Sequence, residues 1–278
     1  MKKEFTLKSS FIEDARSTIH ATVEDLTTAE KMNEWVSSAT EGLISKLTEK
    51  VDESAAMVIA NTIFFDGKWK EQFDEKFTHK ADFFDFHENK ETVNMMNQTS
   101  IFLHQNTSNY QAVVKDYGEK YEIIVVLPKE KSKEALVQVV KEIREDHYSL
   151  NTSFFSKGKA KLSLPRLDLQ FSTVLGDSLK YLGVERVFTS SAQFLNLLEG
   201  KMKESKNVKL SQIFHKTAFR MNEKGTKCES MGLAMASASV VSTSPLFHLN
   251  ANRPFLFFVK HKETQTLLFT GMVQRINE

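Results

Sequence analysis

Two predominantly apolar runs constrain the fold of this chain more than any other feature of the sequence. Residues 55–65 (AAMVIANTIFF) end at Asp66-Gly67, and residues 121–127 (YEIIVVL) end at Pro128. Both runs are short, rich in β-branched and aromatic side chains and bounded by turn residues, which predicts strands buried on both faces. The 278 residues include 22 Phe but only 10 Gly and 4 Pro, so few positions interrupt such strands.

Helical and strand patterns are mixed along the rest of the chain. Residues 28–47 show apolar side chains at helical spacing, residues 133–145 follow a capping Ser132, and residues 171–182 precede a closing Gly183, which predicts three helices. Residues 160–165, 215–222, 255–259 and 266–273 predict further strands. Because strands and helices do not alternate strictly, the predicted class is α+β with large antiparallel sheets.

Length and charge exclude several classes of protein. The length predicts one continuous domain over residues 1–278. With 37 basic and 36 acidic residues, the chain has no long-range attraction to nucleic acid or to a membrane surface, so neither partner is expected. No apolar stretch is long enough to cross a bilayer, and none follows the basic start as in a signal peptide. Cys228 is the single cysteine, which excludes an intrachain disulfide.

The sequence carries none of the common enzyme motifs. It has no Gly-x-Ser-x-Gly, no phosphate-binding loop, no Gly-x-Gly-x-x-Gly and no His-Glu-x-x-His. The eight histidines are scattered, so we expect no metal site and no cofactor. Cys228 is a candidate nucleophile, but its acidic neighbour Glu229 would raise the thiol pKa, which favours an ordinary loop thiol. The sequence therefore predicts a protein that is not an enzyme.

A long segment between two predicted strands, residues 223–247, has an unusual composition. It is rich in Ala, Ser, Met and Val, and connections of this length are usually functional. One set of alternate positions holds only small residues: Thr226, Cys228, Ser230, Gly232, Ala234, Ala236 and Ala238. Side chains alternate faces along a strand, so the segment could become a strand with one closely packing face. The alternative is an exposed loop whose small residues reflect weak constraint.

An ordered set of short motifs resembles one known family, the serpins. The motifs are Asn33-x-Trp35-Val36 with Thr40-x-Gly42, the run from Ala60 to Trp69, Asn94-Met95-Met96, Leu164-Pro165-Arg166, Leu182-Gly183, Ser211 with His215-Lys216, and the two runs 252–257 (NRPFLF) and 269–273 (FTGMV). Asn94 stands where the family usually has Pro. The resemblance implies a serpin-like α+β domain: a large central β-sheet, further antiparallel sheets, surrounding helices and an exposed reactive-centre loop. It also implies that the family's N-terminal third is missing.

The resemblance implies an inhibitor of serine-type endopeptidases, with cysteine proteases as further targets. Such an inhibitor is a suicide substrate: the protease cuts the reactive-centre loop, and the loop then inserts into the main sheet. The implied loop hinge consists of Glu223, Gly225, Thr226, Cys228 and Ser230. The implied shutter and breach residues, beneath and beside the opening strands, are Asn61, His215 and Trp69. The candidate scissile bond is Ser239-Val240, or alternatively a bond near Thr243.

The composition of the loop bears on the target. No Lys or Arg lies between Glu229 and Phe247, which favours an elastase-like protease, or a cysteine protease with a preference for small residues. Lys227, Glu229 and Met231 interrupt the small residues that are usual in the hinge. The alternative is therefore a non-inhibitory serpin-like binding or structural protein, or an inactive truncated isoform. The resemblance implies the extracellular space, whereas a complete chain without a signal peptide would be cytoplasmic.

Overall fold

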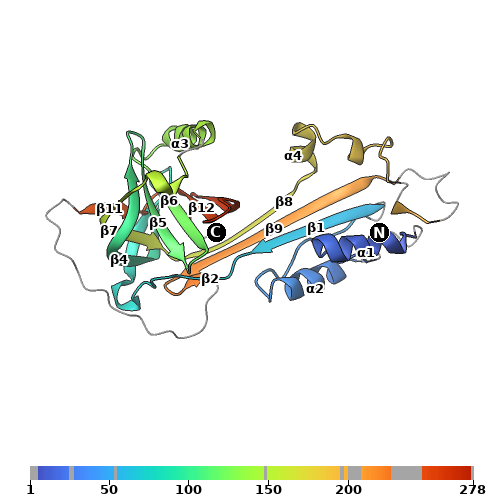
Figure 1. Cartoon of the computed structure of the whole chain (residues 1–278), viewed down its shortest axis with the longest axis horizontal. Coiled ribbons are helices and arrows are strands. Elements are labelled where there is room, and N and C mark those ends of the chain that lie inside the picture. Colours follow the sequence, from blue (N-terminus) through green and yellow to red (C-terminus); the bar gives the residue numbers. More distant parts are fainter. Residues whose placement is uncertain are drawn as a thin grey trace. The chain divides into compact units, whose positions relative to one another are not determined.

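The computed structural model describes residues 6–24, 28–52, 55–146, 149–194, 197–199, 208–226 and 246–276. The chain divides into two compact units, which are described separately (Figure 1). Unit 1 comprises Met1–Phe64 and Gln170–Ala218, and unit 2 comprises Phe65–Leu169 and Phe219–Glu278. That the two units form one domain stays a prediction.

Unit 1 is built on a parallel pair of strands covered by a helix. Strand β1 (Met57–Phe64) runs parallel to β9 (Leu210–Asn222), with Met57 opposite Leu210 and Phe64 opposite Ala218. Helix α2 (Ala29–Ala39) lies along this pair (Figure 1), and Val36, Ile44 and Leu47 pack against Phe214 and Ala218. Unit 1 also contains α1 (Ser9–Ile19), α4 (Gly176–Tyr181), the 3₁₀ turn η3 (Arg186–Phe188) and the end of β8 (Leu167–Val174), a strand that pairs with β9.

Three predictions for unit 1 are wrong in part. The helix predicted over residues 28–47 ends at Ala39, because Glu41 and Gly42 have positive φ angles of 51° and 80°, and Ile44 and Leu47 are buried outside it. The helix predicted over residues 171–182 is strand β8 up to Val174 and helix only from Gly176, since pairing with β9 outweighs the helical spacing. Strand β1 is half-buried, not buried on both faces, and Ile59 is 44% exposed.

Unit 2 contains an eight-stranded sheet. The strand order is β11 (Phe247–Asn250), β7 (Ser156–Pro165), β4 (Lys90–Asn106), β5 (Tyr110–Tyr117), β6 (Tyr121–Pro128), β12 (Phe255–His261) and β13 (Leu267–Val273), with β3 (His79–Phe84) also on β4. All neighbours are antiparallel except β11 and β7. Strand β6 is buried along nearly its whole length, which confirms the prediction for residues 121–127.

Helix α3 (Lys133–Glu145) covers one side of this sheet, and it has the predicted bounds (Figure 1). Ser132 caps it by accepting a hydrogen bond from the Ala135 N–H at 3.1 Å. Leu136 and Val139 pack into a core that includes Tyr110, Ile124 and Val126. Unit 2 also holds β2 (Gly67–Lys68), β10 (Gly225–Thr226) and the 3₁₀ turns η1 (Glu75–Phe77) and η2 (Thr152–Phe154).

Strand β9 belongs to a second sheet, in the order β1-β9-β10-β2, with β8 also paired to β9. Mixed sheets with several helices agree with the predicted α+β class. Within the part of the chain that is described, no helix is both long and apolar enough to span a membrane.

Replacement of Thr40 by Val tests how α2 ends. The fully buried Thr40 hydroxyl donates to the Val36 carbonyl at 2.7 Å and accepts from the Ile44 N–H at 3.0 Å. Val has the same shape but leaves that N–H unpaired, so we expect the free energy of unfolding to fall by about 1–3 kcal/mol. Urea unfolding followed by circular dichroism measures the change. The exposed Ser38→Ala is the control, and equal midpoints for the two variants would contradict the assignment.

Candidate functional site

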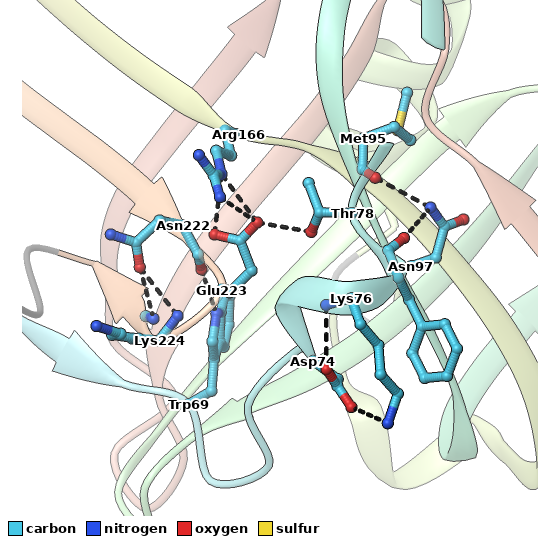
Figure 2. Close-up of polar contacts among 12 residues, drawn as sticks. Trp69, Asp74, Lys76, Thr78, Met95, Asn97, Arg166, Asn222, Glu223 and Lys224 are labelled. Atoms are coloured by element: carbon cyan, nitrogen blue, oxygen red, sulfur yellow. Dashed lines mark hydrogen bonds and ion pairs between the residues drawn. The ribbon is translucent and has the colours of Figure 1, made fainter. Parts of the chain in front are cut away.

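The candidate site lies in unit 2, where the described chain stops before the segment 227–245. Strand β9 ends at Asn222, the chain reverses, and β10 returns antiparallel with Thr226 opposite Met221. The other edge of β10 pairs with β2, which places Thr226 opposite Gly67. The Asn222 side-chain oxygen accepts from the Lys224 N–H at 2.9 Å and the Gly225 N–H at 3.3 Å, and so stabilises the reversal (Figure 2). Thr226 is therefore held in the sheet from both sides.

Gly225 occupies a position at which a side chain would be strained. Its φ angle is +142°, a conformation that side-chain-bearing residues rarely adopt. A Cβ atom built there would lie 2.1 Å from the Gly67 carbonyl oxygen and 2.8 Å from the Lys68 Cα. The close approach of β10 to β2 thus depends on the missing side chain.

Thr226 and Trp69 meet on the same tyrosine. The Thr226 hydroxyl, buried with 1% exposure, donates to the Tyr117 hydroxyl at 2.9 Å. Burial raises the pKa of Tyr117, so the phenol stays protonated. The Trp69 ring stacks on Tyr117 with centroids 4.0 Å apart and planes 13° apart. The Trp69 indole N–H donates to the Asn222 carbonyl at 2.8 Å, and its backbone N–H donates to the Lys224 carbonyl (Figure 2). Through these contacts Trp69 holds the chain reversal at residues 222–225 against the core.

Glu223 supplies a buried charge to the reversal, and Arg166 neutralises it. The carboxylate accepts two hydrogen bonds from the Arg166 Nε at 2.8 and 2.9 Å, and one from the Thr78 hydroxyl at 2.6 Å (Figure 2). A second guanidinium nitrogen of Arg166 lies 2.7 Å from the same carboxylate. Burial alone would raise the pKa of Glu223, but the hydrogen bonds from Arg166 and Thr78 outweigh it and lower the pKa. Glu223 is therefore ionised at neutral pH.

A buried lysine, Lys115, lies next to Trp69 in this site. The Lys115 ammonium donates to the Glu71 carbonyl at 2.6 Å and to the side-chain oxygen of Gln98. It also lies 4.4 Å from the centre of the Phe73 ring and 5.1 Å from that of Trp69. Burial lowers the pKa of Lys115 to about 7, although the nearby acids raise it. Acceptors and aromatic faces compensate the charge where water does not reach it.

Asn61 and His215 form a separate pair in unit 1. They are register partners in the β1–β9 ladder, and the Asn61 Nδ2 lies 3.3 Å from the His215 Nδ1. The other ring nitrogen of His215 lies 3.1 Å from the Thr217 hydroxyl. Asn61 is exposed and His215 half-buried. The two side chains thus link neighbouring strands of the sheet.

The structure brings four of the predicted residues together: Trp69, Glu223, Gly225 and Thr226. Cys228, Ser230, Ser239, Val240 and Thr243 lie outside the described residues. Sequence reasoning missed the roles of Tyr117, Thr78 and Lys115; a lysine inside the apolar run AVVKDY was the one signal available. Arg166 belongs to the motif Leu164-Pro165-Arg166, which by itself predicts no contact with Glu223. In the described ranges, no three His, Cys, Asp or Glu side chains are grouped as metal ligands would be.

The chain belongs to the serpin family. The family profile, described as serpin (serine protease inhibitor), matches residues 1–276. The chain is 31% identical over 274 residues to human Serpin B8, which covers 94% of this chain and 71% of that protein. It is 29% identical over 270 residues to human leukocyte elastase inhibitor, covering 93% and 66%. The chain thus spans about two thirds of the length of these relatives.

Comparison with solved structures finds the same fold. Thyroxine-binding globulin in complex with thyroxine superposes with a TM-score of 0.84 at 23% identity, over 100% of this chain and 74% of that chain. This likeness confirms the serpin-like α+β fold that the motifs implied.

Replacement of Gly225 by Ala tests the reversal. We expect a loss of more than about 2 kcal/mol in the free energy of unfolding. The strain of the backbone at this φ angle and the overlap of the new Cβ atom with β2 both contribute to this loss. Gly118→Ala is the matched control, since Gly118 also has a positive φ angle of 52° but open space around it. Chemical denaturation of both variants measures the difference. A Gly225 variant no less stable than the Gly118 variant would show that the contact with Gly67 is unimportant.

Replacement of Glu223 by Gln tests the buried carboxylate through pH. The folded-state pKa of Glu223 is lowered, so its stabilisation is present above the unfolded pKa of 4.5 and is lost as pH falls through the folded value. We expect the wild type to lose stability more steeply than the variant between about pH 6 and pH 3. Thermal unfolding at several pH values measures this slope. Exposed Glu130→Gln should keep the wild-type slope, and a wild-type slope in the Glu223 variant would refute the assignment.

Proposed function

We propose that this chain inhibits serine proteases as a suicide substrate, with residues 227–245 as the bait. Membership of the serpin family and the name of one relative, leukocyte elastase inhibitor, support inhibition. The observation that carries the mechanism is the register of β10. Thr226 already pairs with β9 and β2, so the bait leaves the sheet from a strand that points along β9.

Continuation of this register places the small residues on one face of β9. Each further residue of the bait meets one earlier residue of β9, so Ser230 would lie opposite Thr217 and Gly232 opposite His215. Directly paired residues of an antiparallel ladder share a face. The set of small alternate residues would therefore enter on the face that carries His215 and Asn61. Lys227, Glu229 and Met231 would stand on the other face, with Glu229 opposite Ala218, which packs in the core under α2.

The strand pair that must open is β1–β9. It is a parallel ladder along the whole of β1, and an entering strand would run antiparallel to both members. One parallel ladder would thus be replaced by two antiparallel ladders, which gain backbone hydrogen bonds and are slightly more stable per residue. This gain supplies the driving force of insertion. Because β9 contributes to both units, we also propose that residues 1–278 act as one domain.

The chemistry belongs to the protease. Its serine oxygen, or the sulfur of a cysteine protease, attacks the carbonyl carbon of the scissile residue, and an ester or thioester forms while the peptide C–N bond breaks. The new amine stays on the fragment that continues into β11. Insertion of the other fragment then carries the attached protease along β9 and distorts its active site. The proposed scissile bond is Ser239-Val240, or one near Thr243, and the proposed target cuts after small residues.

Formation of an SDS-stable complex tests the proposal. The chain is incubated with an elastase-like serine protease, a papain-type cysteine protease and, as a control, trypsin. We expect a covalent band with the first or the second but not with trypsin, because residues 230–246 contain no Lys or Arg. Cleavage of the bait without any covalent complex would instead support the non-inhibitory binding or structural protein.

A pair of neighbouring substitutions tests the insertion register. Ser230→Arg places a long charged side chain among the small residues, whereas Glu229→Arg places the same side chain where a charged one already stands. We expect Ser230→Arg to be cut at the normal rate but to form at least about tenfold less complex, since an unpaired charge beside the half-buried Thr217 would lose part of its hydration. Gel densitometry of complex against cleaved chain gives the ratio. Equal complex yields from the two variants would eliminate insertion in this register.

A further inference from the structure

Three lysines stand at alternate positions of β7, in unit 2. Lys157, Lys159 and Lys161 share one face of the sheet, because strand side chains alternate. Neighbouring lysines of the three are about 7 Å apart along the strand. We call these residues the lysine stripe. Its charge is local, since the whole chain is almost neutral at +1.

The positions paired with the lysine stripe on the two neighbouring strands hold no acidic residue. The paired positions on the same face are Thr99, Ile101 and Leu103 of β4 and His248 of β11. Ile101 is 49% exposed and Lys157 is exposed, whereas Lys159 and Lys161 are half-buried and Leu103 packs against the core under α3. Within the described ranges, none of the three lysines forms an ion pair. Burial lowers the pKa of His248, and the charge of Lys161 lowers it further.

The stripe can recognise a partner by charge alone. Strand β7 is paired on both edges, with β4 and with β11, so its backbone cannot take up another strand. The facing positions on β4 and β11 hold no Phe, Tyr or Trp on which nucleic-acid bases could stack. A surface of compact, hydrated ammonium groups suits the acidic surface of a folded protein.

The stripe lies beside the strand that follows the bait. His248 lies directly opposite Lys161, one residue after the start of β11, and β11 follows the bait. The chain from Val240 to Phe247 spans at most about 25 Å when extended. A protease of about 230 residues has a radius of gyration of about 17 Å, so its body extends over that distance when it holds the bait.

We propose that the lysine stripe docks an acidic patch on the protease that cuts the bait. The inference rests on the proposed function, because it names a second contact of the same partner. The stripe steers the encounter, and such steering raises association rates at low salt and fades as salt is added. It also selects among proteases with similar active-site pockets, since a basic protease surface is repelled.

The test compares charge removal at two places on the full chain. One variant carries Lys157→Gln, Lys159→Gln and Lys161→Gln. The control carries Lys120→Gln, Lys129→Gln and Lys133→Gln, three exposed lysines elsewhere in the same unit. Rates of bait cleavage and of complex formation are measured with two elastase-like proteases, one acidic and one basic at the surface, at low and at high salt. Binding of both proteases with the active-site serine replaced by alanine is measured in parallel.

We expect the stripe variant to react at least about tenfold more slowly with the acidic protease at low salt, and at the wild-type rate at high salt or with the basic protease. The control variant should keep the wild-type rates throughout. A wild-type rate and wild-type binding of the stripe variant to the acidic protease at low salt would overturn the proposal. The proposal would also be overturned if the stripe variant lost binding to a sulfated polysaccharide while its rates with both proteases stayed unchanged. That result would identify the stripe as a binding site for a polyanion.

Failure of the proposed function gives a different result. If the bait is cut without covalent complex, inhibition fails, but the cleavage rates still measure the stripe. If neither protease cuts the bait, the binding measurement decides. Weaker binding of the inactive acidic protease to the stripe variant supports the stripe, and wild-type binding overturns it.

Discussion

The double pairing of Gly225 and Thr226 is the constraint on which the rest of the site depends. These two residues lie between β9 and β2, and the close approach to Gly67 leaves no room for a side chain at Gly225. The pairing determines the direction in which the chain leaves the sheet. Direction and register together decide which residues of the following segment would face which side of β9. The proposed mechanism is therefore a consequence of backbone geometry before any side chain is considered.

Charge is used inside unit 2 where apolar contacts would give less positional control. Arg166 can satisfy the Glu223 carboxylate only in one geometry, and Lys115 requires both its acceptors and its aromatic neighbours. Lys260 and Glu122 form a further buried pair at 3.2 Å between β12 and β6. Replacement of Lys260 or of Glu122 would leave its partner as an uncompensated buried charge, which costs several kcal/mol. These pairs fix positions more than they add stability.

Much of the fold could be predicted from local patterns. Helix α3 and strand β6 follow their capping residue and apolar run closely, because each is stabilised by one dominant core. The helix predicted over residues 171–182 failed because pairing of Leu167–Val174 with β9 is a long-range interaction that periodicity does not report. For the site, the residues near the reversal carried a family resemblance, whereas Tyr117 and Thr78 come from distant strands and turns with no distinctive spacing. Only the three-dimensional structure brings them to Thr226 and Glu223.

The place of β12 in the eight-stranded sheet has a consequence for a chain that has been cut. Strands β11, β12 and β13 all follow the bait in sequence, yet β12 lies between β6 and β13, and β11 lies on β7. A single broken peptide bond before β11 would therefore yield two polypeptides that share one sheet. They could not part without breaking the ladder of β12 with β6. The nicked protein would be a non-covalent heterodimer, of full mass in a native measurement and of two smaller masses only after denaturation.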